Sequence, residues 1–307
     1  MRVVYFGTPE FAVPPLRALV GEGFDVVAVV TRPDRPQGRS RSHVVPPPVK
    51  VVALAEGIPV LQPDRPTDQA FLAAIRDVAP DVGVVVAYGH ILKPELLAIP
   101  VRGMVNLHAS LLPALRGAAP IEWAILNGLD TTGVTIMQMD AGMDSGPILL
   151  QLQTPIPPDE TGGALRERLA ELGAQAVVEA LALLEQGALT PRAQDAARAT
   201  IAPKLTRDTS RIRWIEPAES VARRIRAFDP HPGAWTELGS VELKLFGARA
   251  ATGDGAPGDV LVANSQLLIA CGTGAVEVEE VQPGGKSRMS AAEWIRGRGV
   301  TAGQHLV

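Results

Sequence analysis

The sequence predicts an α/β domain with an open sheet, followed by a small all-β domain. The chain has 307 residues, about twice the length of a typical domain of roughly 150 residues. Continuous apolar runs alternate with segments of helical spacing up to about Gly187, and short alternating segments between Gly and Pro turns dominate the C-terminal part. Hydrophobic residues make up 46% of the chain and charged residues 20%, so a sizeable core is expected and disorder is not.

The first domain is expected to span residues 1–187. Continuous runs of β-branched or small apolar residues are typical of strands covered on both faces, as in a parallel sheet. Such runs predict strands at residues 3–6, 26–30, 82–87, 104–108 and 134–139. Apolar residues at helical spacing predict helices at residues 14–22, 68–78 and 161–187.

Residues 188–206 are expected to form a linker, because the stretch is polar, lacks a clear period and contains Pro191 and Pro203. The second domain would then span residues 207–307 and begin with a helix near residues 217–228. Strands are predicted at residues 234–238, 241–246, 259–262, 266–270 and 275–281. Short strands separated by Gly and Pro turns are typical of a small barrel or sandwich.

Composition excludes several classes of protein. Cys271 is the only cysteine, which rules out a disulfide framework and a cysteine-based zinc site. The formal net charge of −4 argues against indiscriminate coating of nucleic acid. The N-terminus has no signal-peptide pattern, and no run approaches the roughly 18 apolar residues of a spanning helix. A soluble cytoplasmic protein without membrane contact is therefore expected.

The first loop, Gly7 to Phe11, follows a strand as a dinucleotide-binding loop does. The dinucleotide fingerprint needs three glycines at fixed spacing, whereas this loop has only Gly7. Glu10 would also place a negative charge near the helix N-terminus. We therefore expect a simple strand-to-helix turn and no NAD.

A basic segment follows the second predicted strand. From Arg32 to Lys50 there are five Lys or Arg and one acid, Asp34, and Pro and Gly make the segment a loop. Its composition alone favours a solvated loop and contact with phosphate or nucleic acid about equally.

Asn106 and His108 form the first part of the predicted chemical centre. They lie two apart on a strand, so both side chains project from the same face, at the carboxyl edge where open α/β sheets bind ligands. Asn supplies an amide donor and His exchanges a proton near neutral pH. Taken alone, His108 fits a hydrogen-bonded histidine at a strand end better than a catalytic one.

A second loop strengthens the functional interpretation, because Asp140 and Asp144 follow another apolar strand. A carboxylate near an imidazole raises its pKa and fixes its orientation. No serine or cysteine nucleophile is obvious beside these residues. The set therefore indicates direct transfer to an incoming nucleophile, with an amide donor over a developing oxyanion.

Two motifs in this region, Asn106–Pro113 and Arg116–Pro120, resemble the signature of the 10-formyltetrahydrofolate-dependent formyltransferase family. Four further motifs are similar to the branch of that family that acts on methionyl-tRNA. They are Arg32–Arg39, Tyr88–Gly89, Ala202–Leu205 and Gln282–Lys286. The match runs essentially from end to end of the chain.

The resemblance implies a Rossmann-like formyltransferase domain followed by an oligonucleotide-binding-like barrel. It implies transfer of formyl from 10-formyltetrahydrofolate to the methionine α-amino group of initiator methionyl-tRNA, for the initiation of protein synthesis. Neither a metal nor NAD is implied, and we expect a monomer.

The resemblance also implies site residues. The family's catalytic positions are occupied by Asn106, His108 and Asp144. Its folate-binding positions correspond to Ser110, Leu111, Leu112, Pro113 and Asp140, with the backbone around Tyr88, Gly89 and Ile91 facing the pterin. Its tRNA-binding positions correspond to Arg35, Arg39, Arg41 and Lys204. Ala114 and Leu115 replace a basic or aromatic pair, and Arg39 and Arg41 alternate with serines where relatives carry consecutive lysines.

Three other functions remain to be weighed. A formyltransferase acting on a nucleotide-linked amino sugar can share both domains, and glycinamide-ribonucleotide transformylase shares the Asn–His chemistry without a second β domain. The third is a non-catalytic nucleic-acid-binding protein. Residues 32–50 and 204–226 each have a charge balance of +4, which favours a focused tRNA footprint with salt-sensitive binding.

Overall fold

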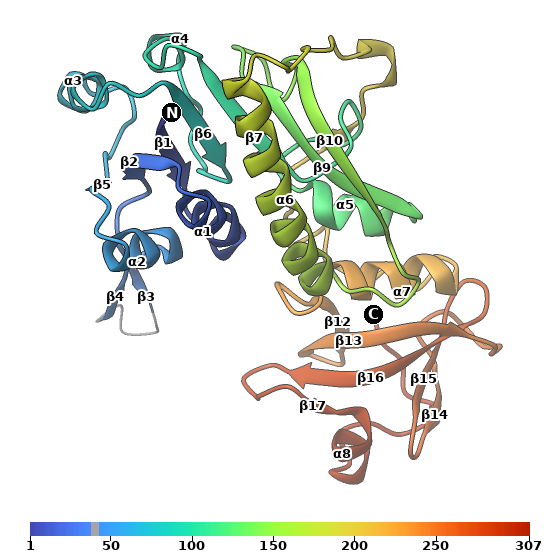
Figure 1. Cartoon of the computed structure of the whole chain (residues 1–307). Coiled ribbons are helices and arrows are strands. Elements are labelled where there is room, and N and C mark those ends of the chain that lie inside the picture. The colour runs from blue at the N-terminus through green and yellow to red at the C-terminus, as the bar shows by residue number, and fades with distance from the viewer. Residues whose placement is uncertain (38–42) are drawn as a thin grey trace. The chain divides into compact units, whose positions relative to one another are not determined.

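A computed structural model describes residues 1–37 and 43–307 (Figure 1). The internal contacts of the chain define two compact units. Unit 1 comprises residues 1–117, 132–154 and 166–201, and unit 2 comprises residues 118–131, 155–165 and 202–307. The boundaries expected from the sequence, with a linker at 188–206, stay a prediction. Arg39 and Arg41 lie outside the described residues.

The centre of unit 1 is a seven-stranded sheet in the order β10-β9-β7-β6-β1-β2-β5. Its strands are β1 (Arg2–Gly7), β2 (Asp25–Val30), β5 (Val60–Leu61), β6 (Val82–Val86), β7 (Met104–His108), β9 (Thr131–Gln138) and β10 (Ile148–Pro155). From β5 to β7 all neighbours pair in parallel. Strand β9 runs antiparallel to β7, so the sheet is mixed at this edge. All five strands predicted for this domain are confirmed.

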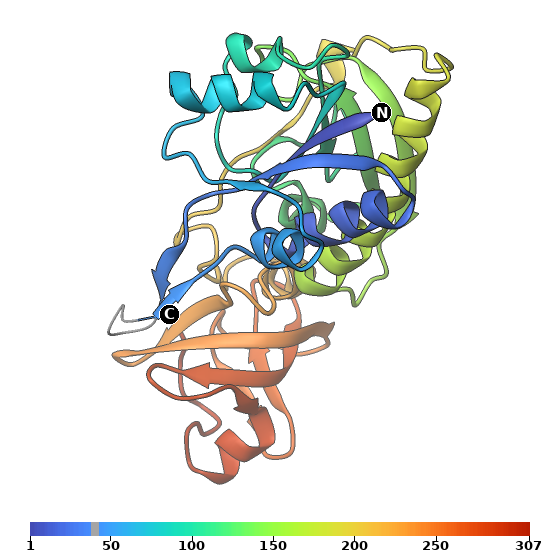
Figure 2. The same ribbon diagram turned by 60° about the vertical axis from the view of Figure 1, so that its left-hand side comes forward.

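Helices cover both faces of this sheet. They are α1 (Val13–Gly21), α2 (Pro48–Ala55), α3 (Gln69–Asp77), α4 (Pro94–Leu97) and α6 (Gly162–Glu185), with a short 3-10 turn η1 (Glu10–Ala12) before α1. Helices α3 and α4 lie on one face, and α1 and α2 on the other (Figure 2). The helices predicted at 14–22, 68–78 and 161–187 are confirmed within two residues.

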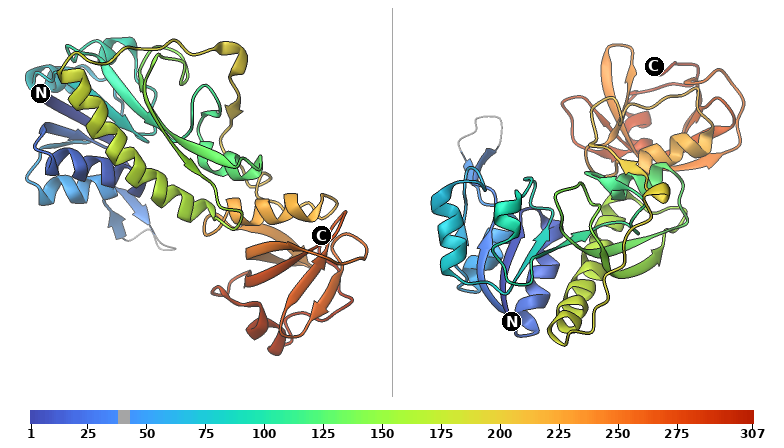
Figure 3. Two further views of the ribbon diagram at one scale, coloured as in Figure 1. Left: turned by 45° about the vertical axis from the view of Figure 1, so that its right-hand side comes forward. Right: turned by 90° about the horizontal axis from the view of Figure 1, so that it is seen from above.

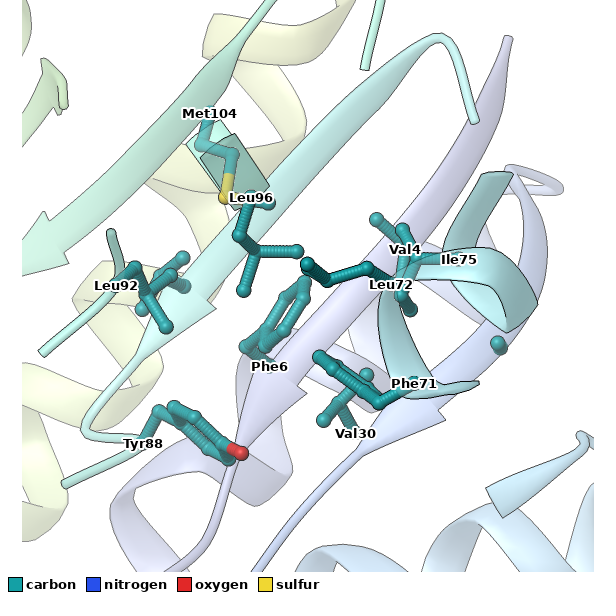
Figure 4. Packing of buried hydrophobic residues seen from close by; sticks show 12 residues of the cluster. Val4, Phe6, Val30, Phe71, Leu72, Ile75, Tyr88, Leu92, Leu96 and Met104 are labelled. Carbon is teal, nitrogen blue, oxygen red and sulfur yellow. The ribbon is translucent and has the colours of Figure 1, made fainter. Parts of the chain in front are cut away.

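The core between the sheet and α3 and α4 shows why the strands read as continuous apolar runs. Val4 and Phe6 of β1 face α3 and α4, and pack with Leu72 of α3, Leu96 of α4 and Met104 of β7 (Figure 4). Tyr5, between them, is buried on the opposite face and donates its hydroxyl to the Ala12 carbonyl at 2.6 Å. Because both faces are covered, successive residues are all apolar.

The chain makes a strand-to-helix turn after β1, as expected for the first loop. A Cβ atom at Gly7 would lie 2.8 Å from the Tyr5 ring and 2.9 Å from the Ala12 Cβ. Glycine is therefore needed there for close packing of the strand-to-helix turn.

Unit 2 contains a six-stranded sheet and three helices. Its strands are β12 (Ala234–Leu238), β13 (Val241–Ala251), β14 (Val260–Ala263), β15 (Leu267–Ala270), β16 (Ala275–Pro283) and β17 (Met289–Ser290), and neighbouring strands pair antiparallel. Helix α7 (Ala218–Ala227) packs across β13 (Figure 3), with Val221, Ala222 and Ile225 buried. The remaining helices are α5 (Pro120–Leu126) and α8 (Ala291–Arg296). The predicted helix and the five predicted strands of this domain are confirmed.

The basic segment after β2 is anchored at its base. Strands β3 (Arg35–Gln37) and β4 (His43–Val45) pair antiparallel. The Lys50 ammonium contacts both Asp34 carboxylate oxygens at 2.7 and 2.9 Å, and it donates to the Gln62 side-chain oxygen at 2.7 Å. The Gln62 amide nitrogen donates to the Arg32 carbonyl at 2.8 Å.

Three shorter elements complete the described chain: β8 (Arg116–Gly117), η2 (Ala196–Arg198) and β11 (Ile201–Ala202). Within the described residues, no helix combines the length and apolar character needed to cross a membrane.

Candidate active site

His108 lies at the carboxyl end of β7, where the sequence places it. Its side chain is 6% exposed, and its Nε2 atom is 2.9 Å from the Leu115 carbonyl oxygen. Since a carbonyl only accepts, this hydrogen bond requires the proton of the neutral ring to be on Nε2. The lone pair of the neutral ring is therefore on Nδ1, which lies 3.7 Å from Oδ2 of Asp144.

Asn106 shares the face of β7 on which His108 lies, and its side chain is half-buried. Unlike the side chains of His108 and Asp144, that of Asn106 makes no hydrogen bond within the described part of the chain. Its amide donor is thus available to a ligand oxygen near the His108 ring.

Asp144 reaches the site by a route that strand spacing did not indicate. Because β9 is antiparallel to β7, its carboxyl end lies beside the start of β7, where the Met139 amide donates to the Met104 carbonyl at 2.8 Å. Residues 139–147 then fold back and bring the Asp144 carboxylate next to His108. Asp144 therefore reaches His108 through this loop and not from the end of the strand itself.

The Asp144 carboxylate is held by backbone as well as by charge. Its Oδ2 atom accepts a hydrogen bond of 2.8 Å from the amide of Gly117, the second residue of the short strand β8 (Arg116–Gly117). Asp144 has φ +51°, a left-handed conformation that is uncommon for a non-glycine residue. The carboxylate is thus fixed in one orientation beside the imidazole.

The segment Ser110–Pro113 is tied to the sheet by Thr135. The Thr135 hydroxyl donates to the Ser110 carbonyl at 2.6 Å and accepts from the Leu112 amide at 3.1 Å. A pocket of about 360 Å³ opens along this segment. It is lined by Leu111, Leu112, Pro113, Ala114, Gln151, Gln153 and Arg198.

The predicted folate-binding side chains have different surroundings. Ser110 is buried and donates its hydroxyl to the Ala114 carbonyl at 2.6 Å, and the Tyr88 ring packs edge-on against Phe6 in the core. Burial raises the pKa of Tyr88 to about 12. Ile91, by contrast, is 82% exposed. Tyr88 as a whole is 1% exposed and its carbonyl accepts a hydrogen bond of 3.0 Å from the Thr8 hydroxyl, whereas Gly89 is exposed. The contact of this backbone with the pterin stays a prediction.

Asp140 lies at the base of the loop that carries Asp144. Its Oδ1 atom accepts from the Gly142 amide at 2.9 Å and from the Ser145 hydroxyl at 3.1 Å. The carboxylate stabilises the turn and is exposed to solvent.

Sequence reasoning missed a second pocket, of about 520 Å³, beside the first loop. Its lining combines Thr8, Pro9, Glu10 and the base of the basic segment, including Arg32, Arg35, Val45 and Pro46–Pro48. The sequence feature that could have indicated this pocket is the run Pro46–Pro48, which contributes to its lining. The pKa of His90, near this pocket, is lowered mainly by burial and further by the positive charges of Arg32 and Arg35.

The predicted tRNA contacts are only partly described. Arg35 and Lys204 are exposed, and Arg39 and Arg41 lie outside the described residues. Lys50, which contributes to the positive balance of residues 32–50, is bound to Asp34. Within the described residues, no group of three or more His, Cys, Asp or Glu side chains is placed to hold a metal ion.

Two family models match the chain. The first, described as Formyl transferase, covers residues 1–181, and the second, described as Formyl transferase, C-terminal domain, covers residues 204–299. The chain therefore belongs to the formyl transferase family. This confirms the resemblance carried by its motifs.

Relatives named methionyl-tRNA formyltransferase share nearly half of their residues with this chain. The protein of Roseiflexus sp. (strain RS-1) is 47% identical over 310 residues, covering 100% of this chain and 95% of the relative. The protein of Geobacter metallireducens is 45% identical over 298 residues, covering 97% and 96%. The protein of Myxococcus xanthus is 46% identical over 303 residues, covering 98% and 96%. The similarity to the tRNA-directed branch is thereby confirmed.

Solved structures confirm the fold class. An N-formyltransferase from Helicobacter canadensis, in complex with folinic acid and dTDP-3-aminofucose, matches with a TM-score of 0.71 at 17% identity, covering 90% of this chain and 97% of that one. HypX from Aquifex aeolicus, in complex with tetrahydrofolic acid, matches with a TM-score of 0.65 at 19% identity, covering 95% of this chain and 46% of HypX. At these identities the likeness shows the fold alone.

Proposed function

We propose that this chain transfers the formyl group of 10-formyltetrahydrofolate to the methionine α-amino group of initiator methionyl-tRNA. The observation that carries the proposal is the arrangement of Asn106, His108 and Asp144 in a chain that is 43–47% identical to methionyl-tRNA formyltransferases. The protein acts as a monomer in the cytoplasm, where initiator tRNA is charged. Sedimentation equilibrium should give a molecular mass of about 32.3 kDa, and a larger mass would contradict the monomer.

The reaction requires a neutral amine, a stabilised oxyanion and a protonated leaving group. The α-amino nitrogen attacks the formyl carbon, and negative charge develops on the formyl oxygen. The Asn106 amide, which has no partner within the described residues, donates to that oxygen. No covalent enzyme intermediate is needed, because the amine is itself the nucleophile.

His108 moves the proton. Its Nδ1 atom carries the lone pair, so Nδ1 accepts the proton that the attacking nitrogen loses and returns it to N10 of the folate as the C–N10 bond breaks. The Asp144 carboxylate, 3.7 Å away, stabilises the imidazolium formed between these two steps. The Leu115 carbonyl holds the ring on the opposite side.

A direct assay tests this function. Purified protein with 10-formyltetrahydrofolate should formylate initiator methionyl-tRNA, and should do so faster than it formylates elongator methionyl-tRNA. An amino-sugar nucleotide offered in place of tRNA should receive no formyl group. Activity on the amino sugar and none on tRNA would contradict the proposal.

Two substitutions test the site within that assay. Asn106→Ala should lower kcat by about 10²- to 10³-fold, the usual loss for one oxyanion donor. His108→Ala should lower it by about 10²- to 10⁴-fold. A His108→Ala protein with unchanged kcat would show that the proton is moved by another group.

A further inference from the structure

Gln194 lies in the stretch expected to be a linker, yet its side chain contacts the loop that carries Asp144. Its Nε2 atom donates to the Asp144 carbonyl at 2.9 Å and to the Gly146 carbonyl at 2.8 Å. Both hydrogens of the amide nitrogen are therefore engaged on one turn of the loop. Gln194 is half-buried and belongs, like Asp144, to unit 1.

The oxygen of the same amide is held by Arg116. The Arg116 Nε and Nη2 atoms donate to Oε1 of Gln194 at 3.1 and 2.7 Å, in a two-pronged contact. Arg116 directly precedes Gly117, whose amide binds the Asp144 carboxylate at 2.8 Å. Asp144 is thus fixed at its carboxylate by Gly117 and at its carbonyl by the Arg116–Gln194 pair.

This double attachment explains how Asp144 keeps an unfavourable backbone conformation. A non-glycine residue at φ +51° persists only where surrounding contacts determine it. Without the Gln194 bonds, the 139–147 loop would relax, and Oδ2 of Asp144 would move away from Nδ1 of His108. A displacement of about 1 Å in a reacting group can cost about 10²-fold in rate.

We propose that Gln194, held by Arg116, is a positioning residue for formyl transfer, which sets the Asp144 carboxylate against His108. The inference rests on the proposed function, because Asp144 is assigned there. Gln194 touches neither substrate in this scheme, so it acts only on the chemical step and only through Asp144.

The test measures single-turnover rates with enzyme in excess over formyl donor and methionyl-tRNA, together with both KM values. Gln194→Ala should lower the rate by roughly 10- to 100-fold and leave both KM values unchanged. Gln186→Ala is the matched control, because Gln186 is exposed and its side chain makes no hydrogen bond within the described residues. It should behave as the unaltered protein.

A double-mutant cycle separates positioning from general destabilisation. In an Asp144→Ala background, Gln194→Ala should cause no further loss of rate, since its target is gone. An equal loss in both backgrounds would overturn the inference. If Gln194→Ala fails to fold, Gln194→Glu replaces it. The glutamate keeps an oxygen for Arg116, but its second oxygen cannot donate to the Asp144 and Gly146 carbonyls. The rate should therefore fall to a similar extent. A Gln194→Glu protein with full activity would also overturn it.

The two proposals fail in different ways. If Asp144→Ala keeps full activity, the proposed site is wrong at Asp144 itself, and the role of Gln194 falls with it. If Asp144→Ala is impaired while Gln194→Ala is fully active, the proposed function stands and only the positioning role is wrong.

Discussion

At the scale of single residues, the two nitrogens of His108 have separate tasks because their surroundings differ. The Leu115 carbonyl holds Nε2 and leaves the basic lone pair on Nδ1, toward Asp144. Leu115 adopts φ +58°, so its carbonyl direction depends on an uncommon conformation of the Leu111–Leu115 segment. The chemistry at His108 therefore depends on the turn that ends at Leu115, and Thr135 holds the start of this turn through Ser110 and Leu112.

Thr135→Val should destabilise the protein by about 2–6 kcal/mol. Valine has the same shape, but its methyl group leaves the Ser110 carbonyl and the Leu112 amide without their buried partner, at about 1–3 kcal/mol each. Thr132→Val, in the same strand, is the control. The Thr132 hydroxyl is buried and has no partner in the described structure, so its removal should be neutral or stabilising. Urea unfolding of both variants measures the difference, and equal losses would contradict the argument.

His90 gives a prediction on pH. Burial and the positive charges of Arg32 and Arg35 lower its pKa. Arg35→Gln should raise that pKa toward the ordinary value near 6.5, as followed by NMR titration, whereas Arg17→Gln should not.

The unfolded chain protonates His90 more readily than the folded one. The contribution of His90 to stability is therefore present above about pH 6.5 and is lost as pH falls through the lowered pKa of the folded state. The free energy of unfolding of His90→Gln should therefore fall less at acid pH than that of the unaltered protein. An unchanged or lower pKa in Arg35→Gln would contradict the assignment.

The residues of the site were predictable to different degrees. Asn106 and His108 follow from the two-residue period of a strand. The loop pattern offered Asp140 and Asp144 equally as a carboxylate near the imidazole, and only the resemblance singled out Asp144. The path by which the loop returns to His108 could not be predicted, because the antiparallel direction of β9 is a tertiary property that no local pattern records. Gln194 escaped prediction because polar stretches interrupted by proline indicate a linker, and its partners lie 48 to 78 residues away in the chain.

At the scale of elements, the loop between β9 and β10 brings Asp144 next to His108 at the end of β7. Its two ends are joined by the bond of 2.9 Å from the Gln138 amide to the Pro147 carbonyl. Gly146 lies so close to this closure that a Cβ atom there would overlap the Gln138 carbonyl oxygen, which is backbone and cannot give way. The loop therefore tolerates no side chain at this point.

Gly146→Ala should lower the rate of formyl transfer by about 10²-fold, because the loop must open and carry Asp144 with it. Gly142→Ala is the control within the same loop. A Cβ atom there meets the Ser145 hydroxyl, the end of a side chain that can rotate away. Single-turnover rates and melting temperatures of both variants test the difference. Equal activity of the two proteins would show that closure of the loop is unimportant.

Elements that begin with proline account for much of what the sequence did not predict. Helices α2, α4 and α5 begin at Pro48, Pro94 and Pro120, and none of them was among the helices expected from the sequence. Proline suits the first helical position because the amide there has no partner within the helix. Long periodic helices such as α6 and continuous apolar strands such as β6 were predictable, since packing and local pattern agree there.

At the scale of the whole molecule, ion pairs decide which cations of the two basic segments stay available to a phosphate backbone. In residues 204–226, Arg224 pairs with Glu216 at 3.2 Å, Arg207 with Glu242 at 2.6 Å and Arg213 with Asp208 at 3.5 Å. In residues 32–50, Lys50 pairs with Asp34 at 2.7 Å. Asp34, Asp208 and Glu216 already enter the balances of +4, so among these ion pairs only Arg207–Glu242, whose acid lies outside the segment, lowers a balance.

The affinity for initiator methionyl-tRNA should fall as salt rises, with a slope set by the unpaired cations rather than by the sequence count. Each phosphate contact releases condensed counterions, so removing one contact reduces the slope of log K against log salt by about one. Arg35→Gln should show this reduction, because Arg35 is exposed, and no side-chain hydrogen bond or ion pair is found for it within the described residues. Arg76→Gln, on α3 and 3.8 Å from Glu95, should leave the slope unchanged. Filter binding across a series of salt concentrations measures both slopes. A salt-independent affinity, or an equal reduction in the two variants, would mean that the basic segment is a solvated loop, the alternative that its composition favours equally.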